Sequence, residues 1–143
     1  MIPKFTEEGF LPKGIYKATI EEVKTSFGIS NPKRKKLFNG LLRALNNLKS
    51  SGIKKVYIDG SFISSKTSPN DIDGCWEIPK NLDRQILDPV FQDFSYERKA
   101  MKQKYSVEFF PATWIEGDSG YPFVLFFQLN RDGKEKGIIL IEL

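Results

Sequence analysis

The sequence of 143 residues contains no histidine and a single cysteine, Cys75. Without histidine the chain cannot form a Ser-His-Asp triad, and it lacks the imidazole ligands of most catalytic zinc sites. One cysteine excludes an internal disulfide and a zinc site built from several cysteines. Cys75 lies in a predicted strand, and we expect it to be a small core residue because no histidine is present to activate it as a nucleophile.

The chain also lacks long hydrophobic runs and low-complexity segments. No stretch reaches the roughly 18 apolar residues of a membrane-spanning helix, and no charged-then-apolar leader is evident. We therefore expect a cytoplasmic protein that makes no membrane contact. The residues are 40% hydrophobic and 13% aromatic, which is enough for a packed core. This length predicts one domain over residues 1–143, with residues 1–30 as a clamp segment on a core formed by 31–143.

Positive charge is in modest excess, with a formal net charge of +4. The densest basic run is Lys33-Arg34-Lys35-Lys36, and Lys99, Lys102 and Lys104 form a sparser group. Such clusters can bind the phosphates of RNA, DNA or nucleotides. They are equally typical of the solvated faces of helices, and the modest net charge favours this second interpretation.

Hydrophobic spacing and turn residues predict an α/β (α+β) fold, a small mixed β-sheet flanked by helices. The clearest helix covers residues 31–51, where Asn31 can cap the first turn, Pro32 fits the next position and leucines recur every three or four residues. Shorter helices are expected over 19–27 and, with a break near Pro89, over 81–104. Strands are predicted over residues 53–58, 71–78, 105–110, 123–129 and 137–143, the last two as a hairpin.

The most informative stretch is Gly60-Ser61, a polar loop of nine residues, and then Asp71-Ile72-Asp73. Side chains two apart on a strand share a face, so Asp71 and Asp73 are expected to point the same way. Paired carboxylates repel each other unless a cation lies between them, and Mg²⁺ prefers oxygen ligands of this kind. An alternative is that the two aspartates simply end a strand in solvent.

The opposite side of this predicted site is suited to phosphate oxygens. Gly60 permits a sharp turn and a close approach of a ligand, and Ser61 adds a hydroxyl and an N–H group. Lys66, within the loop, could neutralise a triphosphate or could simply be solvated. A phosphate cradle beside a metal site is the chemistry of phosphoryl or nucleotidyl transfer.

The segments IDGSF and NDID together resemble the signature of the DNA polymerase beta-like nucleotidyltransferase superfamily. That signature is an apolar residue, Gly-Ser or Gly-Gly, a spacer of about ten residues, and Asp-x-Asp or Asp-x-Glu. Short prokaryotic members of the superfamily are similar in three longer pieces, which are GFLPKGIYKATIEEV, DGSFISSKTSPNDIDG and FFQLNRDGKEKGIILIEL. The chain departs from the pattern at Gly74, where members often carry an apolar residue.

The resemblance implies a nucleotidyltransferase-like fold and metal-dependent transfer of a nucleotidyl group from an NTP, such as ATP, to an acceptor hydroxyl. Asp71 and Asp73 would bind Mg²⁺ or Mn²⁺. A third acidic residue, usually Asp, comes from a later strand, and Glu108 in YSVEFF matches that position best, as a general base or a third metal ligand. The acceptor could be RNA, a protein or a small molecule. Short members include toxin–antitoxin components, so a partner protein or a homodimer is plausible by resemblance.

Two alternatives from other functional classes stay open. The chain could be a catalytically silent member of this superfamily that acts as a protein-binding or nucleic-acid-binding module. It could also be a basic RNA- or DNA-binding domain that uses residues 33–36, in which case binding would depend steeply on salt concentration.

Overall fold

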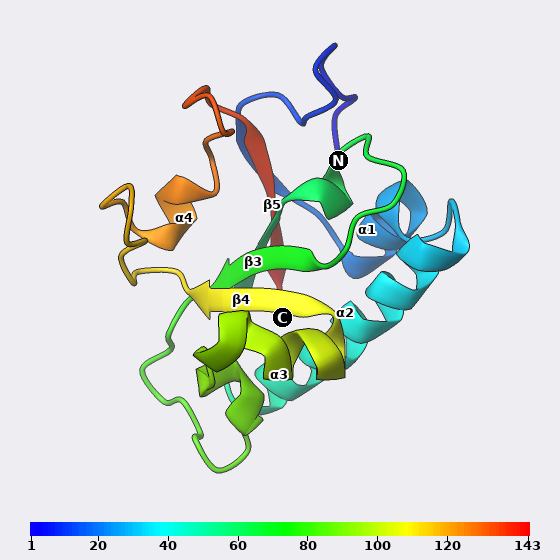
Figure 1. The fold of residues 1–143 in the computed structure, drawn as a ribbon. Coiled ribbons are helices and arrows are strands. Elements are labelled where there is room, and N and C mark those ends of the chain that lie inside the picture. The colour runs from blue at the N-terminus through cyan, green and yellow to red at the C-terminus, as the bar shows by residue number, and fades with distance from the viewer.

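The computed structural model describes all 143 residues and places a five-stranded mixed sheet at the centre of the fold (Figure 1). The strand order is β1–β5–β2–β3–β4. Strand β5 is parallel to β1 and antiparallel to β2, and β3 is antiparallel to β2 and parallel to β4. The predicted fold class is confirmed. The strands are β1 Gly14–Lys17, β2 Lys55–Asp59, β3 Ile72–Trp76, β4 Val107–Pro111 and β5 Gly137–Glu142.

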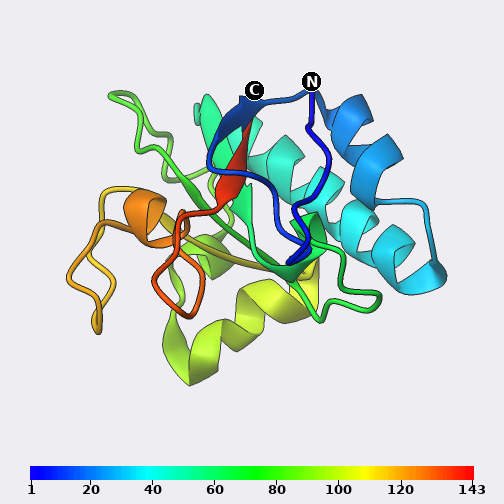
Figure 2. The same cartoon turned by 90° about the horizontal axis from the view of Figure 1, so that it is seen from above.

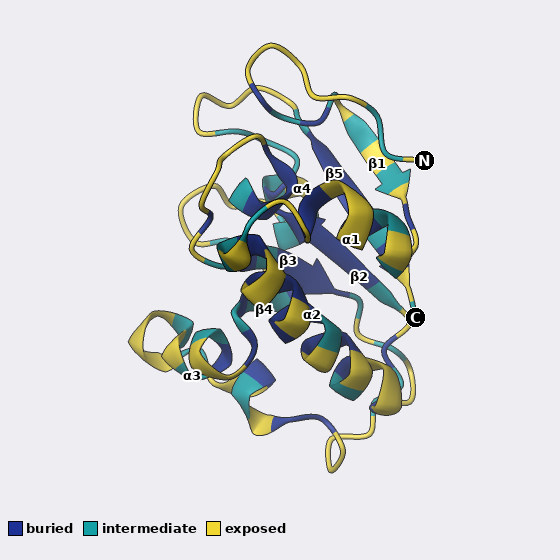
Figure 3. Ribbon diagram, turned by 90° about the vertical axis from the view of Figure 1, so that its right-hand side faces the viewer, coloured by how far each residue is buried: buried dark blue, intermediate teal, exposed yellow.

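Helices α1 and α2 cover one face of the sheet, and the main core lies between them and the strands (Figure 2). Helix α2, Pro32–Ser50, starts as predicted, because the Asn31 side chain accepts a hydrogen bond from the Arg34 N–H. Helix α1, Ile20–Phe27, is closed at its start by a capping box between Thr19 and Glu22. Figure 3 shows the central strands and the inner side of α2 as buried.

The other face of the sheet has a much thinner cover. It carries a small core of five buried residues, with partly buried aromatic side chains packed against it. The only helix there is α4, Phe123–Phe126, which lies with its flanking loops on the opposite side of the sheet from α1 and α2 (Figure 2). Cys75 is buried in this small core, as expected. Because Tyr57 and Cys75 face this side, Asp59 and Asp73, two residues away on the same strands, face it too.

Two predicted segments are wrong. Residues 123–129 do not form a strand or a hairpin with β5, because Pro122 precedes the helical turn α4 and the aromatic rings of Phe123, Phe126 and Phe127 pack at helical spacing. Residues 81–88 are not helical. The Asp83 side chain accepts hydrogen bonds from backbone N–H groups two and three residues later, which stabilises a turn instead.

Strand β1 lies within the N-terminal segment 1–30, for which the sequence predicts no strand. Its order comes from parallel pairing with β5, a partner more than a hundred residues away, so no local pattern predicts it. The predicted helix beyond Pro89 is present in two pieces. They are the short 3₁₀ helix η2, Pro89–Gln92, and α3, Ser95–Tyr105, which lies along β4 at the sheet edge. No helix of the fold has the length and apolar character needed to cross a bilayer.

Candidate metal centre

Three carboxylates converge on the thinly covered face of the sheet. Asp71 immediately precedes β3, Asp73 lies within β3, and Glu108 is the direct neighbour of Asp73 on the parallel strand β4. One oxygen atom from each of these side chains lies within 4.8 Å of the other two. The structure therefore brings together the three acidic residues that the sequence singled out, and an ion with oxygen ligands could bind all of them.

A fourth carboxylate, Asp59, extends this group and was missed by sequence reasoning. It pairs with Asp73 across β2 and β3, so Asp59, Asp73 and Glu108 form a row over three adjacent strands. Asp59 is only 4% exposed, and its Oδ1 accepts a hydrogen bond of 2.7 Å from Lys136 Nζ. The sequence feature that could have identified Asp59 is its place as a charged residue at the end of an apolar strand, directly before Gly60.

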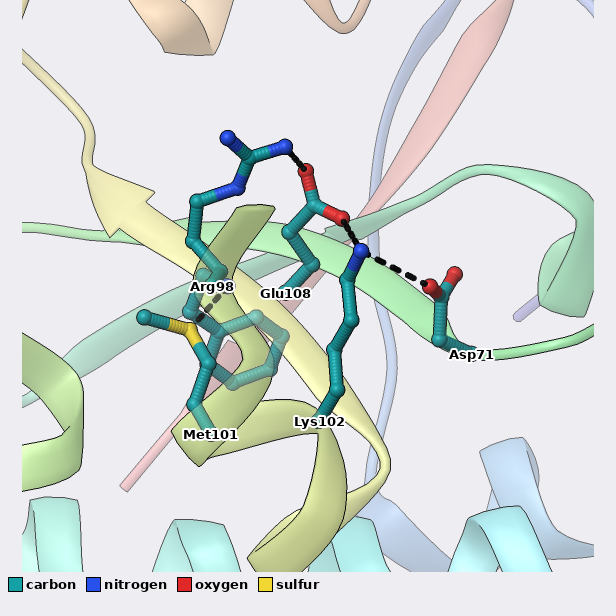
Figure 4. A network of polar contacts seen from close by, with 6 residues as sticks. Asp71, Arg98, Met101, Lys102 and Glu108 are labelled. Carbon is teal, nitrogen blue, oxygen red and sulfur yellow. Dashed lines mark hydrogen bonds and ion pairs between the residues drawn. The ribbon is translucent and has the colours of Figure 1, made fainter. Parts of the chain in front are cut away.

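Basic side chains from α3 occupy the outer part of the acidic group (Figure 4). Arg98 Nη2 lies 3.0 Å from Glu108 Oε1, and Lys102 Nζ lies 2.9 Å from Glu108 Oε2 and 4.0 Å from Asp71 Oδ2. Asp73, at the centre of the group, forms no ion pair. The sequence placed Lys102 in a sparse basic group but gave no reason to connect it with the carboxylates.

The central carboxyl group is electrostatically unfavourable in its ionised form. Burial, and then the nearby charges of Asp71, Asp59 and Glu108, raise the pKa of Asp73 to about 8. Burial and the charge of Glu108 also raise the pKa of Asp71. A divalent cation between these side chains would relieve the repulsion and favour the ionised forms.

The Gly60-Ser61 turn lies directly beside Asp73, as the motif predicts. Gly60 has φ +82°, which favours glycine, and a Cβ atom at this position would collide with the Asp73 carboxylate. Ser61 then begins the short 3₁₀ helix η1, Ser61–Ile63. The glycine is therefore needed for both the turn and the close approach of the two segments.

Arg34 organises the loop that connects the turn to Asp71. Its guanidinium is buried and donates five hydrogen bonds to main-chain carbonyl oxygens, with no carboxylate partner. Four of these oxygens belong to the loop itself, at residues 61, 62, 64 and 66, and the fifth belongs to Phe27. The interpretation of the whole basic run at 33–36 as a solvated surface is therefore wrong for Arg34, because the side chain turns inward to carbonyl groups of the 61–66 loop and of Phe27.

Lys66, the predicted phosphate-binding lysine, is an exposed residue. Its carbonyl oxygen binds Arg34, and its N–H donates to Ser64 Oγ at 3.2 Å. The charges of Lys66 and Lys33 counteract the rise in the pKa of Asp71. Both lysines therefore contribute positive potential near the carboxylates from the loop side.

Comparison with known proteins gives a family but no activity. No curated protein and no solved structure matches the chain. Residues 3–142, nearly the full length, match the model of a protein family. The chain accordingly belongs to the family described as Family of unknown function (DUF6932).

Proposed function

We propose that this protein is a metal-dependent nucleotidyltransferase that moves a nucleotidyl group from an NTP to an acceptor hydroxyl. The observation that carries the proposal is the convergence of Asp71, Asp73 and Glu108 within 4.8 Å, beside a glycine turn that contacts Asp73. The resemblance of the Gly-Ser and Asp-x-Asp segments to the polymerase beta-like superfamily supports the same activity.

The carboxylates fit a hard divalent cation, Mg²⁺ or Mn²⁺, because every available ligand atom is an oxygen. Asp71 and Asp73 would hold the ion, and Glu108 would act as a third ligand or take the proton of the attacking hydroxyl. The bound ion would neutralise charge on the phosphates and orient the α-phosphate for in-line attack. Neutral Asp73 would have to lose its proton when the ion binds.

The loop between Gly60 and Asp71 fits the phosphate side of this reaction. Arg34 binds the carbonyl oxygens of Ser61, Phe62, Ser64 and Lys66, which keeps their negative ends turned inward and away from an incoming phosphate. The Ser61 hydroxyl and the Lys66 ammonium are the groups we assign to phosphate binding, together with the backbone at Gly60. The proposed acceptor class covers RNA, protein and small molecules.

The direct test is incubation with each α-labelled NTP and Mg²⁺ or Mn²⁺, in the presence of RNA, protein and small-molecule acceptors. We expect one nucleotide to label one class of acceptor, and the double change Asp71→Ala and Asp73→Ala to abolish labelling. Asp118→Asn, at an exposed loop carboxylate, is the matched control and should retain activity. Labelling that survives the double change would refute the proposal.

One observation favours a second candidate, a catalytically silent protein-binding module. Arg98 and Lys102 already neutralise Glu108, so the outer carboxylates are stable without a metal. A silent protein would show no rise in melting temperature when Mg²⁺ or Mn²⁺ is added with an NTP. It would also show no change in that response when Asp71 and Asp73 are replaced. A metal-dependent rise of several degrees that disappears in the variants would exclude this candidate.

A further inference from the structure

We infer that Lys102 and Arg98 are polyphosphate-binding residues that serve as counterions of the carboxylates only while no divalent cation is bound. This inference rests on the proposed function and adds two residues to its substrate site. Both side chains form ion pairs with Glu108. When a cation takes the carboxylates, both would turn to the triphosphate that enters with it.

The first step is competition for the same atoms. Lys102 Nζ bridges Glu108 and Asp71, which are two of the three carboxylates that converge on the candidate metal position. A divalent cation bound to those oxygens would repel an ammonium and a guanidinium at the same place. The metal and the two basic side chains therefore cannot all occupy the carboxylates as drawn in Figure 4.

The second step is that the displaced charges stay beside the site. Arg98 and Lys102 both belong to α3 and both reach Glu108 in β4, so their side chains lie on the same side of this segment. Between them Met101 is fully buried, and its sulfur accepts a hydrogen bond from the Phe109 N–H at 3.2 Å. This contact anchors the helix to β4, so the side chains, and not the helix, are expected to move.

The third step is the direction in which they can move. The side chains of Arg98 and Lys102 are about 30% exposed, whereas that of Glu108 is 17% exposed. The basic groups thus lie on the solvent side of the carboxylates, where a substrate must approach. A nucleoside triphosphate carries about four negative charges, of which one divalent ion offsets only two, and Arg and Lys are the usual ligands for the remainder.

The backbone before Arg98 shows that its present position is held under strain. Tyr96, Glu97 and Arg98 all have positive φ, between 50° and 61°, a conformation that residues other than glycine rarely adopt in succession. The Arg98 Nε is buried without a hydrogen-bond partner. Strained backbone of this kind clusters at functional sites and ligand clamps, and the incompletely satisfied guanidinium is free to take another partner.

A purely structural ion pair and a phosphate-binding residue predict opposite results for Lys102→Gln. If Lys102 competes with the metal and binds phosphate, its neutral variant should bind Mn²⁺ alone about threefold to tenfold more tightly. The same variant should bind a non-hydrolysable NTP analogue, at saturating Mn²⁺, at least about tenfold more weakly. If Lys102 only stabilises the fold, both affinities should fall together or stay unchanged.

Calorimetric titration with Mn²⁺ alone, and then with the NTP analogue and Mn²⁺, measures both affinities. Lys99→Gln, an exposed lysine of the same helix that forms no ion pair, is the matched control and should change neither. Lys102→Arg should restore analogue binding to within about threefold of wild type, which separates loss of charge from misfolding. Equal or parallel changes in the two affinities of Lys102→Gln overturn the inference. Absence of Mn²⁺ binding by the wild-type protein overturns the proposed function itself.

Discussion

Replacing Asp73 with asparagine should stabilise the metal-free protein, although it removes the residue at the centre of the candidate site. Asn keeps the shape of the side chain and cannot ionise. The pKa of Asp73 is about 8, against 3.8 for an ordinary aspartate. The unfolded chain therefore releases this proton at neutral pH, whereas the folded chain retains it. At pH 7 the unfolded state is favoured by the ionisation of Asp73 over about 3 pH units. The resulting loss in the free energy of unfolding is at most roughly 4 kcal/mol.

Protein and water relax around an ionised carboxylate, so the actual loss is smaller than this limit. We expect Asp73→Asn to raise the free energy of unfolding by about 2 kcal/mol at pH 7 in EDTA. For a protein of this size the gain corresponds to a rise in melting temperature of roughly 5–10 °C. The sign follows from proton linkage, because an acid with a raised pKa in the folded state loses stability as pH rises from about 4 to about 8. The advantage of the variant should therefore shrink toward pH 5.

Metal should reverse this order. At about a hundred times its dissociation constant, a divalent cation stabilises the wild-type fold by about 2.7 kcal/mol, which exceeds the advantage of the variant in EDTA, and the variant should gain almost nothing. Urea unfolding of the wild-type protein and the variant, each in EDTA and in Mn²⁺ at pH 5, 6, 7 and 8, measures the free energies of unfolding that this comparison needs. Asp118→Asn, at an exposed carboxylate, should change neither stability nor the metal response. A variant that is less stable than wild type in EDTA at pH 7, or that gains as much from Mn²⁺, would refute the electrostatic reasoning.

Three further predictions concern the turn, the loop and the titration of the site. Gly60→Ala should lower the free energy of unfolding by about 2 kcal/mol or more and remove the Mn²⁺ response, because the new methyl group would collide with Asp73. Gly133 has a similar φ but open space around it, so Gly133→Ala measures the backbone cost alone in the same unfolding assay. Arg34→Met should lose at least about 3 kcal/mol in urea, since several buried carbonyl groups lose their donor, whereas exposed Arg43→Met should lose less than about 1 kcal/mol. Mn²⁺ affinity should rise by up to about tenfold per pH unit toward pH 8 and then level off, and an affinity that stays flat from pH 6 to 8 would show that no proton leaves Asp73.

Much of the framework is encoded in local sequence. The leucine spacing and the Asn31 cap predict α2 almost to its ends, since a helix depends on contacts three and four residues apart. Strands β2, β3 and β4 follow from short apolar runs bounded by turn residues. The shared direction of Asp71 and Asp73 follows from the two-residue period of a strand, and Gly60 marks the turn.

The failures occur where tertiary partners override local preference. The aromatic run from Phe123 favours a strand by propensity, but packing on the sheet face selects a helical turn. Arg34 belongs to a run of charged residues that is typical of a surface, yet its guanidinium is buried because it binds carbonyl groups of the distant 61–66 loop and of nearby Phe27. No spacing within the run distinguishes it from its neighbours.

Asp71, Asp73 and Glu108 could be identified as candidates from residue type and spacing, and their carboxylates converge. The place of Asp59 in the same row, and the ion pairs of Arg98 and Lys102 with Glu108, emerge only in the folded chain. The physical reason is that side-chain direction along one strand is a local property, whereas register between strands and the approach of α3 depend on the packing of the whole chain.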